Sequence, residues 1–142
     1  MDKPIAGYGW FIKCIDNALE KEANQNLQSL NLTMQQNRVL IHLAHAQEHT
    51  LSLKALEERF GAAQSTVAGL VSRLEKKGLI QAVPDPADKR VKLAKLTPAG
   101  VMVHAQSRQF VVDSEARLTA HLSEEERAIF LSCLKKVFDT VK

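Results

Sequence analysis

Apolar residues recur in the middle of the chain at the spacing of one helix face. Val67, Leu70, Val71 and Leu74 stand at i, i+3, i+4 and i+7, which places four apolar side chains on one stripe of an α-helix. The opposite face combines small side chains with cations towards its C-terminal end: Ser65, Gly69, Ser72, Arg73 and Lys76, with Thr66 at its edge. Small side chains permit close approach to a groove, and cations suit phosphate. The pattern therefore favours a helix that lies in the major groove of DNA.

The residues after this helix predict a turn and a β-hairpin. Two lysines and Gly78 follow the apolar stripe, and this combination is typical of a helix C-terminus. Residues 79–83 and 91–96 predict two short strands, joined by a loop over 84–90 that is rich in proline and aspartate and has a basic tip. A helix pair followed by a basic hairpin is a winged helix-turn-helix, whose loop tip could reach a phosphate or a minor groove.

Three amphipathic helices are predicted ahead of this region. Residues 4–30 keep apolar side chains at steps of three and four. Thr33 caps the second helix, and Gln36 three residues later completes a capping box. Ser52 caps a short third helix that ends at a turn on Gly61. The short third helix and the groove-facing helix after it would form the helix-turn-helix.

Two further helices are predicted after the hairpin. Thr97 followed by Pro98 begins a helix that runs to about His121, and Ser123 with Glu126 forms the capping box of the last one. The last helix carries a continuous apolar stripe: Ile129, Phe130, Cys133, Leu134, Val137, Phe138 and Val141. Because no later segment covers this stripe, and because the first helix is also strongly apolar, a second subunit is the expected partner of both. The fold class is mainly α with a small β-hairpin wing, a winged helix-turn-helix core flanked by N- and C-terminal dimerisation helices.

The positive charge of the chain is concentrated where the groove-facing helix and hairpin lie. The 142 residues carry a formal net charge of only +3. Between residues 61 and 95, seven Lys or Arg residues stand against three Asp or Glu residues, so this stretch has +4 and the remainder −1. Such a local excess is the electrostatic signature of a DNA-binding surface.

Other function classes lack their signals. The start of the chain is no signal peptide and no apolar run approaches membrane-spanning length, so we expect a cytoplasmic protein without membrane contact. Cys14 and Cys133 form neither a disulfide framework nor a metal motif. No glycine-rich phosphate loop, nucleophile elbow or paired carboxylates are present, so we expect neither an enzyme nor a cofactor.

Several motifs occur together in a fixed order along nearly the whole chain, and together they resemble the multiple-antibiotic-resistance regulator (MarR) family of bacterial transcription factors. The resemblance implies a homodimer that binds palindromic double-stranded DNA operators, mostly as a repressor, and that a small aromatic or phenolic effector releases. The motifs are Leu32-Thr33-x-x-Gln36, Val67-x-x-Leu70-Val71-x-Arg73-Leu74-Glu75-Lys76-Lys77-Gly78-Leu79-Ile80, Pro84-Asp85-Pro86-x-Asp88-Lys89-Arg90, Leu96-Thr97-x-x-Gly100 and Leu122-Ser123-x-Glu125-Glu126.

The candidate DNA contacts follow from the helix, the hairpin and the resemblance. Residues at the N-terminal end of the groove-facing helix suit base edges, whereas its C-terminal cations suit phosphates. By resemblance, Asp88 orients the basic side chains of the wing while Arg90 reaches DNA. Ala63 departs from the family, in which Ser or Thr commonly caps this helix. The predicted DNA-binding residues are Gln64, Ser65, Thr66, Gly69, Ser72, Arg73, Lys76, Lys77, Asp88, Lys89, Arg90 and Lys92.

Three regulatory sites are weighed from the sequence. An effector pocket between the first, second and fifth helices would be lined by Trp10, Phe11, Arg38, His42 and Met102, although all five could equally be core or surface. Cys14 could sense peroxide, but no cationic surroundings that would activate its thiol are evident, and an apolar filler is the simpler interpretation. His42, His45 and His49 recur at steps of three and four and could bind a metal, but no further ligand converges on them, so we expect none.

We therefore predict a single domain over 1–142, in which 33–97 form the winged-helix DNA-binding lobe and 4–30 and 98–142 form dimerisation helices. The alternative is a helical protein-interaction module that has lost DNA binding. The cations gathered on the hairpin argue against that alternative, because such a module would have no use for them.

Overall fold

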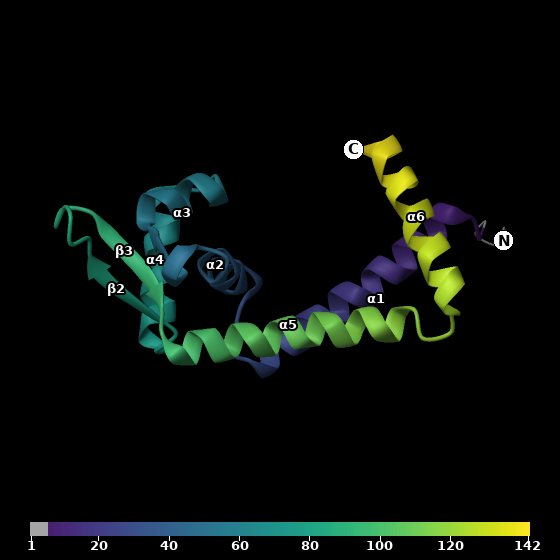
Figure 1. The fold of residues 1–142 in the computed structure, drawn as a ribbon, viewed down its shortest axis with the longest axis horizontal. Coiled ribbons are helices and arrows are strands. Elements are labelled where there is room, and N and C mark those ends of the chain that lie inside the picture. Colours follow the sequence, from purple (N-terminus) through teal and green to yellow (C-terminus); the bar gives the residue numbers. More distant parts are fainter. Residues whose placement is uncertain (1–5) are drawn as a thin grey trace, which may run out of the picture. The chain divides into compact units, whose positions relative to one another are not determined.

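The computed structural model describes residues 6–142 (Figure 1). Pro4 and Ile5, which the predicted first helix included, lie outside the described residues. The helices are α1 (Tyr8–Ser29), α2 (Met34–Ala44), α3 (Leu53–Phe60), α4 (Gln64–Lys76), α5 (Pro98–Leu118) and α6 (Glu124–Val141), with a 3₁₀ turn η1 (Gln47–His49). The strands are β1 (Thr50–Ser52), β2 (Ile80–Pro84) and β3 (Lys92–Leu96). The chain divides into two compact units, one ending at Phe110 and the other running from Val111 to Lys142.

The predicted helix caps of the first unit are confirmed. The backbone N–H of Gln36 donates to Thr33 Oγ1 over 3.1 Å, and Gln36 Oε1 accepts from the N–H of Thr33 over 3.2 Å. Ser52 Oγ accepts from the N–H of Ala55 at 3.0 Å and so caps α3. These bonds satisfy N–H groups that have no partner inside their helices.

Two glycines end helices as predicted. Gly61 follows α3 with φ of +59°, and Gly78 lies just beyond α4 with φ of +76°. Both angles lie in the left-handed region, which glycine adopts without steric cost. The chain can therefore turn sharply at each end of the segment that contains α4.

The sheet contains one strand more than the sequence predicts. Its order is β1-β3-β2, and both pairs are antiparallel. The predicted hairpin corresponds to β2 and β3. In addition, β1 pairs with β3 from Thr50 opposite Lys95 to Ser52 opposite Leu93. A three-residue strand carries too little periodicity to be recognised, and this one exists because a distant strand supplies its hydrogen bonds.

The histidine row predicted along one helix face is wrong at its end. Helix α2 stops at Ala44, and His49 lies in the 3₁₀ turn with φ of +53°. Glu48 also has a positive φ of 54°, so His49 does not continue the helical spacing of His42 and His45. The polar residues that precede β1 supply no apolar side chain to prolong the helix.

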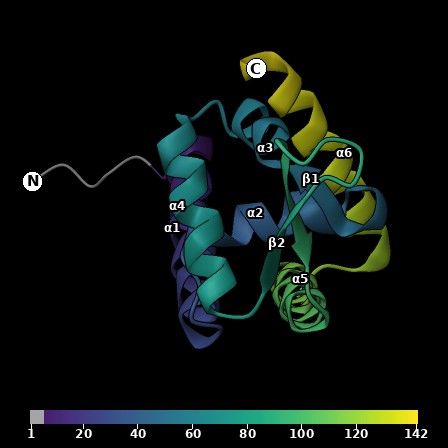
Figure 2. The ribbon, with the colours of Figure 1, turned by 90° about the vertical axis from the view of Figure 1, so that its left-hand side faces the viewer.

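The core of the first unit is built from one face each of α2, α3 and α4 and from the sheet. The predicted stripe of α4 is confirmed, since Val67 and Leu74 have no exposed surface and Leu70 and Val71 are also buried. The other fully buried side chains are Val39, Leu40, Leu43, Leu56, Ile80 and Ala94. Figures 1 and 2 show these helices gathered around the sheet. The mainly helical, winged-helix fold class is thereby confirmed.

In the second unit, the last helix is capped but uncovered. Ser123 and Glu126 form the predicted capping box. No residue of α6 is buried in the single chain, and its large apolar side chains are exposed. Helix α5 ends at Leu118, three residues before the predicted end at His121, and 119–121 form a turn. Within 6–142, no helix combines the length and apolar character that a membrane span requires.

Candidate nucleic-acid interface

The outward face of α4 presents the residues predicted to contact DNA. Burial of the apolar stripe turns the opposite side of the helix to solvent, so most of the predicted residues there are exposed and Gly69 is half-buried. A Cβ on Gly69 would lie 3.5 Å from a terminal nitrogen of Arg73. The structure brings together on this face Gln64, Ser65, Thr66, Gly69, Ser72, Arg73 and Lys76.

The N-terminal end of α4 has no side-chain cap. Ala63 accepts hydrogen bonds through its backbone oxygen from Thr66 and Val67, but its side chain offers no acceptor to the first turn. Helix N-termini carry unpaired N–H groups and the positive end of the helix dipole. This end of the helix therefore suits an external anion, and a phosphate is the anion that DNA presents.

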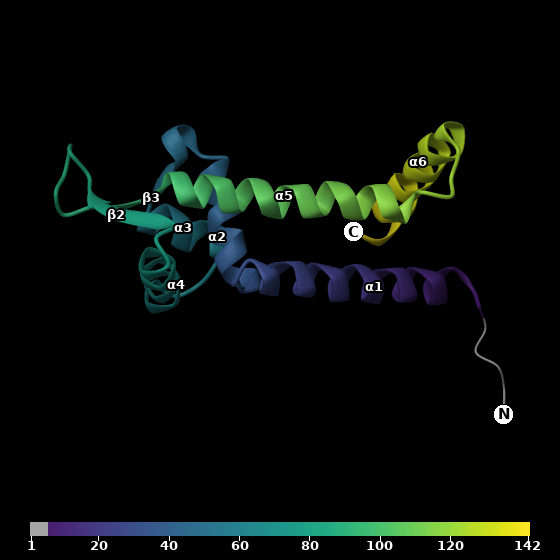
Figure 3. The ribbon, with the colours of Figure 1, turned by 90° about the horizontal axis from the view of Figure 1, so that it is seen from below.

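The hairpin lies beside α4, and its loop extends beyond the helix (Figures 1 and 3). Its tip is held by hydrogen bonds: Asp85 N–H donates to the oxygen of Val91 over 2.8 Å, and Val91 N–H donates to the oxygen of Asp88 over 2.9 Å. Asp85 Oδ1 also accepts from the N–H of Ala87 at 2.9 Å. An ordered tip can present its cations to a groove at lower entropic cost than a mobile one.

Asp88 pairs with Arg90 at the tip. Asp88 Oδ1 accepts from both the backbone N–H and Nε of Arg90, each at 3.1 Å. These hydrogen bonds, the one from the Arg90 side chain first, lower the pKa of Asp88 below its ordinary value. The Arg90 side chain nevertheless stays 91% exposed. The aspartate thus orients the guanidinium without burying it, while Lys89 and Lys92 are exposed beside it.

Lys77 is held differently from the other predicted cations. Its Nζ donates to the backbone oxygen of Asn31 and, over 2.9 Å, to Oε1 of Gln36. Lys76, the preceding residue, is exposed and makes no hydrogen bond or ion pair within 6–142. Sequence spacing gives no sign of this difference, because Gln36 and Lys77 are 41 positions apart.

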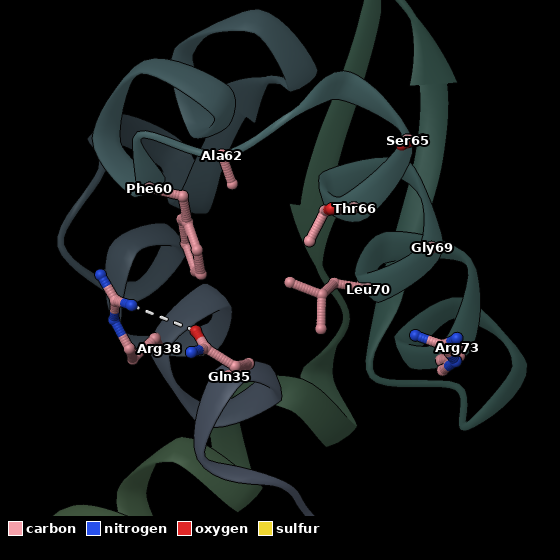
Figure 4. Close-up of a pocket in the computed structure, with 9 residues that line it drawn as sticks. All are labelled: Gln35, Arg38, Phe60, Ala62, Ser65, Thr66, Gly69, Leu70 and Arg73. Carbon is pink, nitrogen blue, oxygen red and sulfur yellow. Dashed lines mark hydrogen bonds between the residues drawn. The ribbon is translucent and has the colours of Figure 1, made fainter.

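A pocket of about 380 Å³ opens between α2, α3 and the outward face of α4. Figure 4 shows Phe60 and Leu70 facing its interior and Arg38 beside Phe60. The Arg38 guanidinium lies 4.5 Å from the centroid of the Phe60 ring and donates to Gln35 Oε1 over 3.1 Å. The lining residues are Gln35, Arg38, Phe60, Ala62, Ser65, Thr66, Gly69, Leu70 and Arg73.

Of the five residues predicted to line an effector pocket, this one includes only Arg38. His42 is close by, with its ring centroid 5.5 Å from that of Phe60. Trp10 and Phe11 pack edge to face at 4.9 Å near the start of α1, and both are exposed, as is Met102. No local sequence pattern marks Phe60 as a pocket residue, because its contact with Arg38 joins two separate helices.

A second group of histidines lies between α2 and α5. The ring centroids of His45 and His104 are 6.1 Å apart. Burial lowers the pKa of His104, and the charges of His45, Arg108 and His49 lower it further. Burial likewise lowers the pKa of His42, and the charges of Arg59, Arg38 and His45 lower it further. Among the described residues no three His, Cys, Asp or Glu side chains are grouped to hold a metal, and Cys14 and Cys133 are exposed free thiols.

An exposed recognition helix and an ordered basic wing on one lobe define the class of DNA-binding winged-helix transcriptional regulators. A model described as the MarR family matches residues 30–91. The multiple antibiotic resistance protein MarR of Escherichia coli (strain K12) is 29% identical over 134 residues, which cover 94% of this chain and 92% of that protein. The S. aureus MepR–DNA complex superposes with a TM-score of 0.84 at 26% identity, over 95% of this chain and 100% of that chain.

The family model and these relatives support a regulator of the MarR family, whose members are transcription regulators and not enzymes. A protein of Thauera aromatica assigned to transcriptional regulation of the hcr operon is 33% identical over 88 residues. That match covers 62% of this chain, and this chain spans only 53% of the Thauera protein. The similarity to that relative thus falls on part of both chains, whereas the similarity to E. coli MarR extends along nearly the full length of each.

Proposed function

We propose that this protein is a homodimeric repressor that binds a palindromic operator and is released from it by a small-molecule effector. The observation that carries the proposal is the joint exposure of the α4 face and of the Asp88–Arg90 pair on one lobe. The bound DNA in the MepR complex supports it, because that protein shares the fold along nearly its whole length. We expect a cytoplasmic protein, as for bacterial regulators of transcription in general.

Each protomer would insert α4 into a major groove. Gln64, Ser65 and Thr66 lie at the end of the helix that enters first and would contact base edges, which specify sequence. Arg73 and Lys76 would contact phosphates, which position the protein without specifying sequence. Arg90 would reach the flanking minor groove, where arginine is favoured by the negative potential.

The dimer would form through apolar faces that the single chain leaves exposed. Helix α6 exposes Ile129, Phe138 and Val141 among others, and α1 exposes Trp10 and Phe11. Monomeric proteins rarely expose so much contiguous apolar surface. A two-fold axis between two such chains would place two copies of α4 about one turn of DNA apart, roughly 34 Å.

The effector would act most directly from the pocket beside α4. Ser65, Thr66 and Arg73 line this pocket and also belong to the face proposed to meet DNA. An aromatic carboxylate there would stack on Phe60 and pair with Arg38, as its shape and charge require. A bound ligand would then compete with the operator for the same helix face.

Fluorescence anisotropy across a salt series tests the proposal. The wild type and Arg90→Ala are titrated with DNA from upstream of the protein's own gene and with a scrambled duplex. Lys21→Ala, which removes one exposed cation of α1, is the matched control. We expect tight, sequence-preferring binding whose affinity falls steeply with salt, and roughly a tenfold or greater loss in Arg90→Ala but not in the control.

Two outcomes of this assay count against the proposal. If the wild type binds both duplexes weakly and with little dependence on salt, a helical interaction module is favoured. If Arg90→Ala and Lys21→Ala lose equal affinity, the wing does not contact DNA. The same assay with added salicylate, and with benzyl alcohol as the uncharged comparison, tests release. A complex unaffected by any aromatic carboxylate would leave the regulator without the effector proposed here.

A further inference from the structure

The Lys77 side chain connects the end of the recognition helix with the corner between α1 and α2. Its ammonium donates to the backbone oxygen of Asn31, the second residue after α1, and to Oε1 of Gln36 in the first turn of α2. One side chain thus joins three helices of the first unit. Lys77 itself remains exposed, so these hydrogen bonds hold a side chain that is still in contact with solvent.

Both acceptor oxygens are held in place by interactions that do not involve Lys77. Asn31 adopts a left-handed backbone with φ of +55°, a conformation that asparagine tolerates better than most residues, and its N–H donates to the oxygen of Gln28 over 2.9 Å. Gln36 is only 4% exposed, and the oxygen that accepts from Lys77 is the same one that accepts from Thr33 in the capping box. The two oxygens therefore form a fixed pair of hydrogen-bond acceptors for the ammonium group.

The opposite side of the same turn is fixed as well. Thr97 Oγ1 donates to the oxygen of Gly78 over 2.6 Å, and its N–H donates to the oxygen of Leu79 over 3.1 Å. A Cβ on Gly100 would lie 2.1 Å from the oxygen of Leu79, so only glycine permits this approach. The turn that ends α4 is thereby held between the α1–α2 corner and the start of α5.

We propose that Lys77 is a positioning residue for DNA recognition and makes no phosphate contact. By anchoring the C-terminal end of α4, it fixes the direction in which the N-terminal end of the helix enters the groove. Two of its three N–H donors bind protein oxygens, which hold the ammonium at the α1–α2 corner and leave only one donor unengaged. Lys76, which has no such partners among the described residues, remains available to a phosphate. This inference rests on the proposed function.

A comparison of adjacent lysines tests it in the full-length protein. Lys76→Met and Lys77→Met remove the same charge one residue apart, and operator affinity is measured for each across a salt series. Each lost phosphate contact reduces the slope of log affinity against log salt by about 0.9, so by about two in a symmetric dimer. We expect this reduction in Lys76→Met only. Lys77→Met should lose roughly three- to tenfold in operator affinity at an unchanged slope, because a looser helix costs more to order on binding.

Substitutions of Gln36 test the same contact while leaving every cation in place. Gln36→Leu removes the acceptor and should reproduce the loss of affinity at unchanged slope, whereas Gln36→Glu keeps an acceptor oxygen and should retain wild-type affinity. Combined with Lys77→Met, Gln36→Leu should add little to the loss of operator affinity, since the Lys77 contact is already absent. The capping-box acceptor for Thr33 that Gln36→Leu also removes should lower thermal stability instead. Thermal unfolding shows which variants are folded, and the Gln36 pair decides the question if Lys77→Met is not.

The outcomes separate the two proposals. A reduced salt slope in Lys77→Met, or wild-type affinity in Gln36→Leu, overturns the positioning role of Lys77 while the regulator stands. A wild type that does not distinguish operator from scrambled DNA overturns the proposed function itself.

Discussion

Helices α4 and α6 carry the same kind of apolar stripe but bury it differently. In α4 the four stripe residues are all buried, and two of them have no exposed surface. In α6 no residue is buried, and Phe138 is 62% exposed. An amphipathic pattern therefore predicts that a helix needs a partner, but does not say whether its own chain supplies it.

Local stabilisation differs between the two helices in the opposite sense. Helix α6 has a complete capping box and three acidic residues in its first turn, where they interact favourably with the helix dipole. Helix α4 has neither a side-chain cap nor an acidic first turn. Core packing holds α4 in place while its N-terminal end has no side-chain cap, whereas α6 relies on local interactions in the single chain.

Leu74→Ala should give the largest effect, because it opens a cavity under α4. Leu74 has no exposed surface, and removing a buried leucine side chain typically costs about 2–5 kcal/mol of unfolding free energy. Urea unfolding measures the loss, which should be the same at every protein concentration. The loss of unfolding free energy in Leu134→Ala, the matched change in α6, should become smaller as the protein is diluted, because the proposed dimer then dissociates. Equal, concentration-independent losses would contradict the comparison.

Phe138→Ala should weaken the dimer without unfolding the chain. An aromatic side chain at the centre of an interface typically contributes about 2 kcal/mol, which corresponds to roughly a thirtyfold rise in the dimer dissociation constant. Sedimentation equilibrium measures this constant, with Lys136→Ala as the control on the same helix. A dissociation constant unchanged by Phe138→Ala would place the interface elsewhere, and the exposed stripe of α6 would need another partner.

The features that sequence analysis predicted correctly depend on residues a few positions apart. The apolar stripe of α4, the capping boxes at Thr33 and Ser123, and the glycine turns at Gly61 and Gly78 all follow from side chains within one or two helical turns. Short-range geometry is nearly the same in every protein, so these signals hold without knowledge of the tertiary structure.

The features that it did not predict join distant parts of the chain. Strand β1 forms only because β3, some 40 residues later, pairs with it. Lys77 was grouped with the phosphate contacts because its neighbours are cationic, and its two acceptors belong to other helices. The pocket beside α4 depends in the same way on Arg38 meeting Phe60. Such contacts are set by packing, which residue spacing does not encode.

The pH dependence of the unfolding free energy should also differ between the first unit and α6, with a smaller effect than the substitutions above. In the first unit, burial and the neighbouring His45, Arg108 and His49 lower the pKa of His104 from its ordinary 6.5. In the second unit, hydrogen bonds from Ser123 lower the pKa of Glu126 from its ordinary 4.5. The histidine resists gaining a charge in the folded state, whereas the glutamate is stabilised in its charged form.

The two shifts act in different pH ranges. The unfolded chain protonates position 104 near pH 6.5, before the folded chain does, so stability falls as pH drops below that value and continues to fall towards the lowered pKa. The contribution of Glu126 is fully present above pH 4.5 and is lost as pH falls through its lowered pKa. Urea unfolding at fixed protein concentration should show a flatter profile below pH 6.5 in His104→Gln, but not in His121→Gln, the matched change at an exposed histidine. Glu126→Gln should alter the profile only in the lower range. If the stability of His104→Gln changes with pH in the same way as that of the wild type, protonation of His104 does not contribute to acid sensitivity. The pH dependence of stability would then not distinguish the first unit from α6.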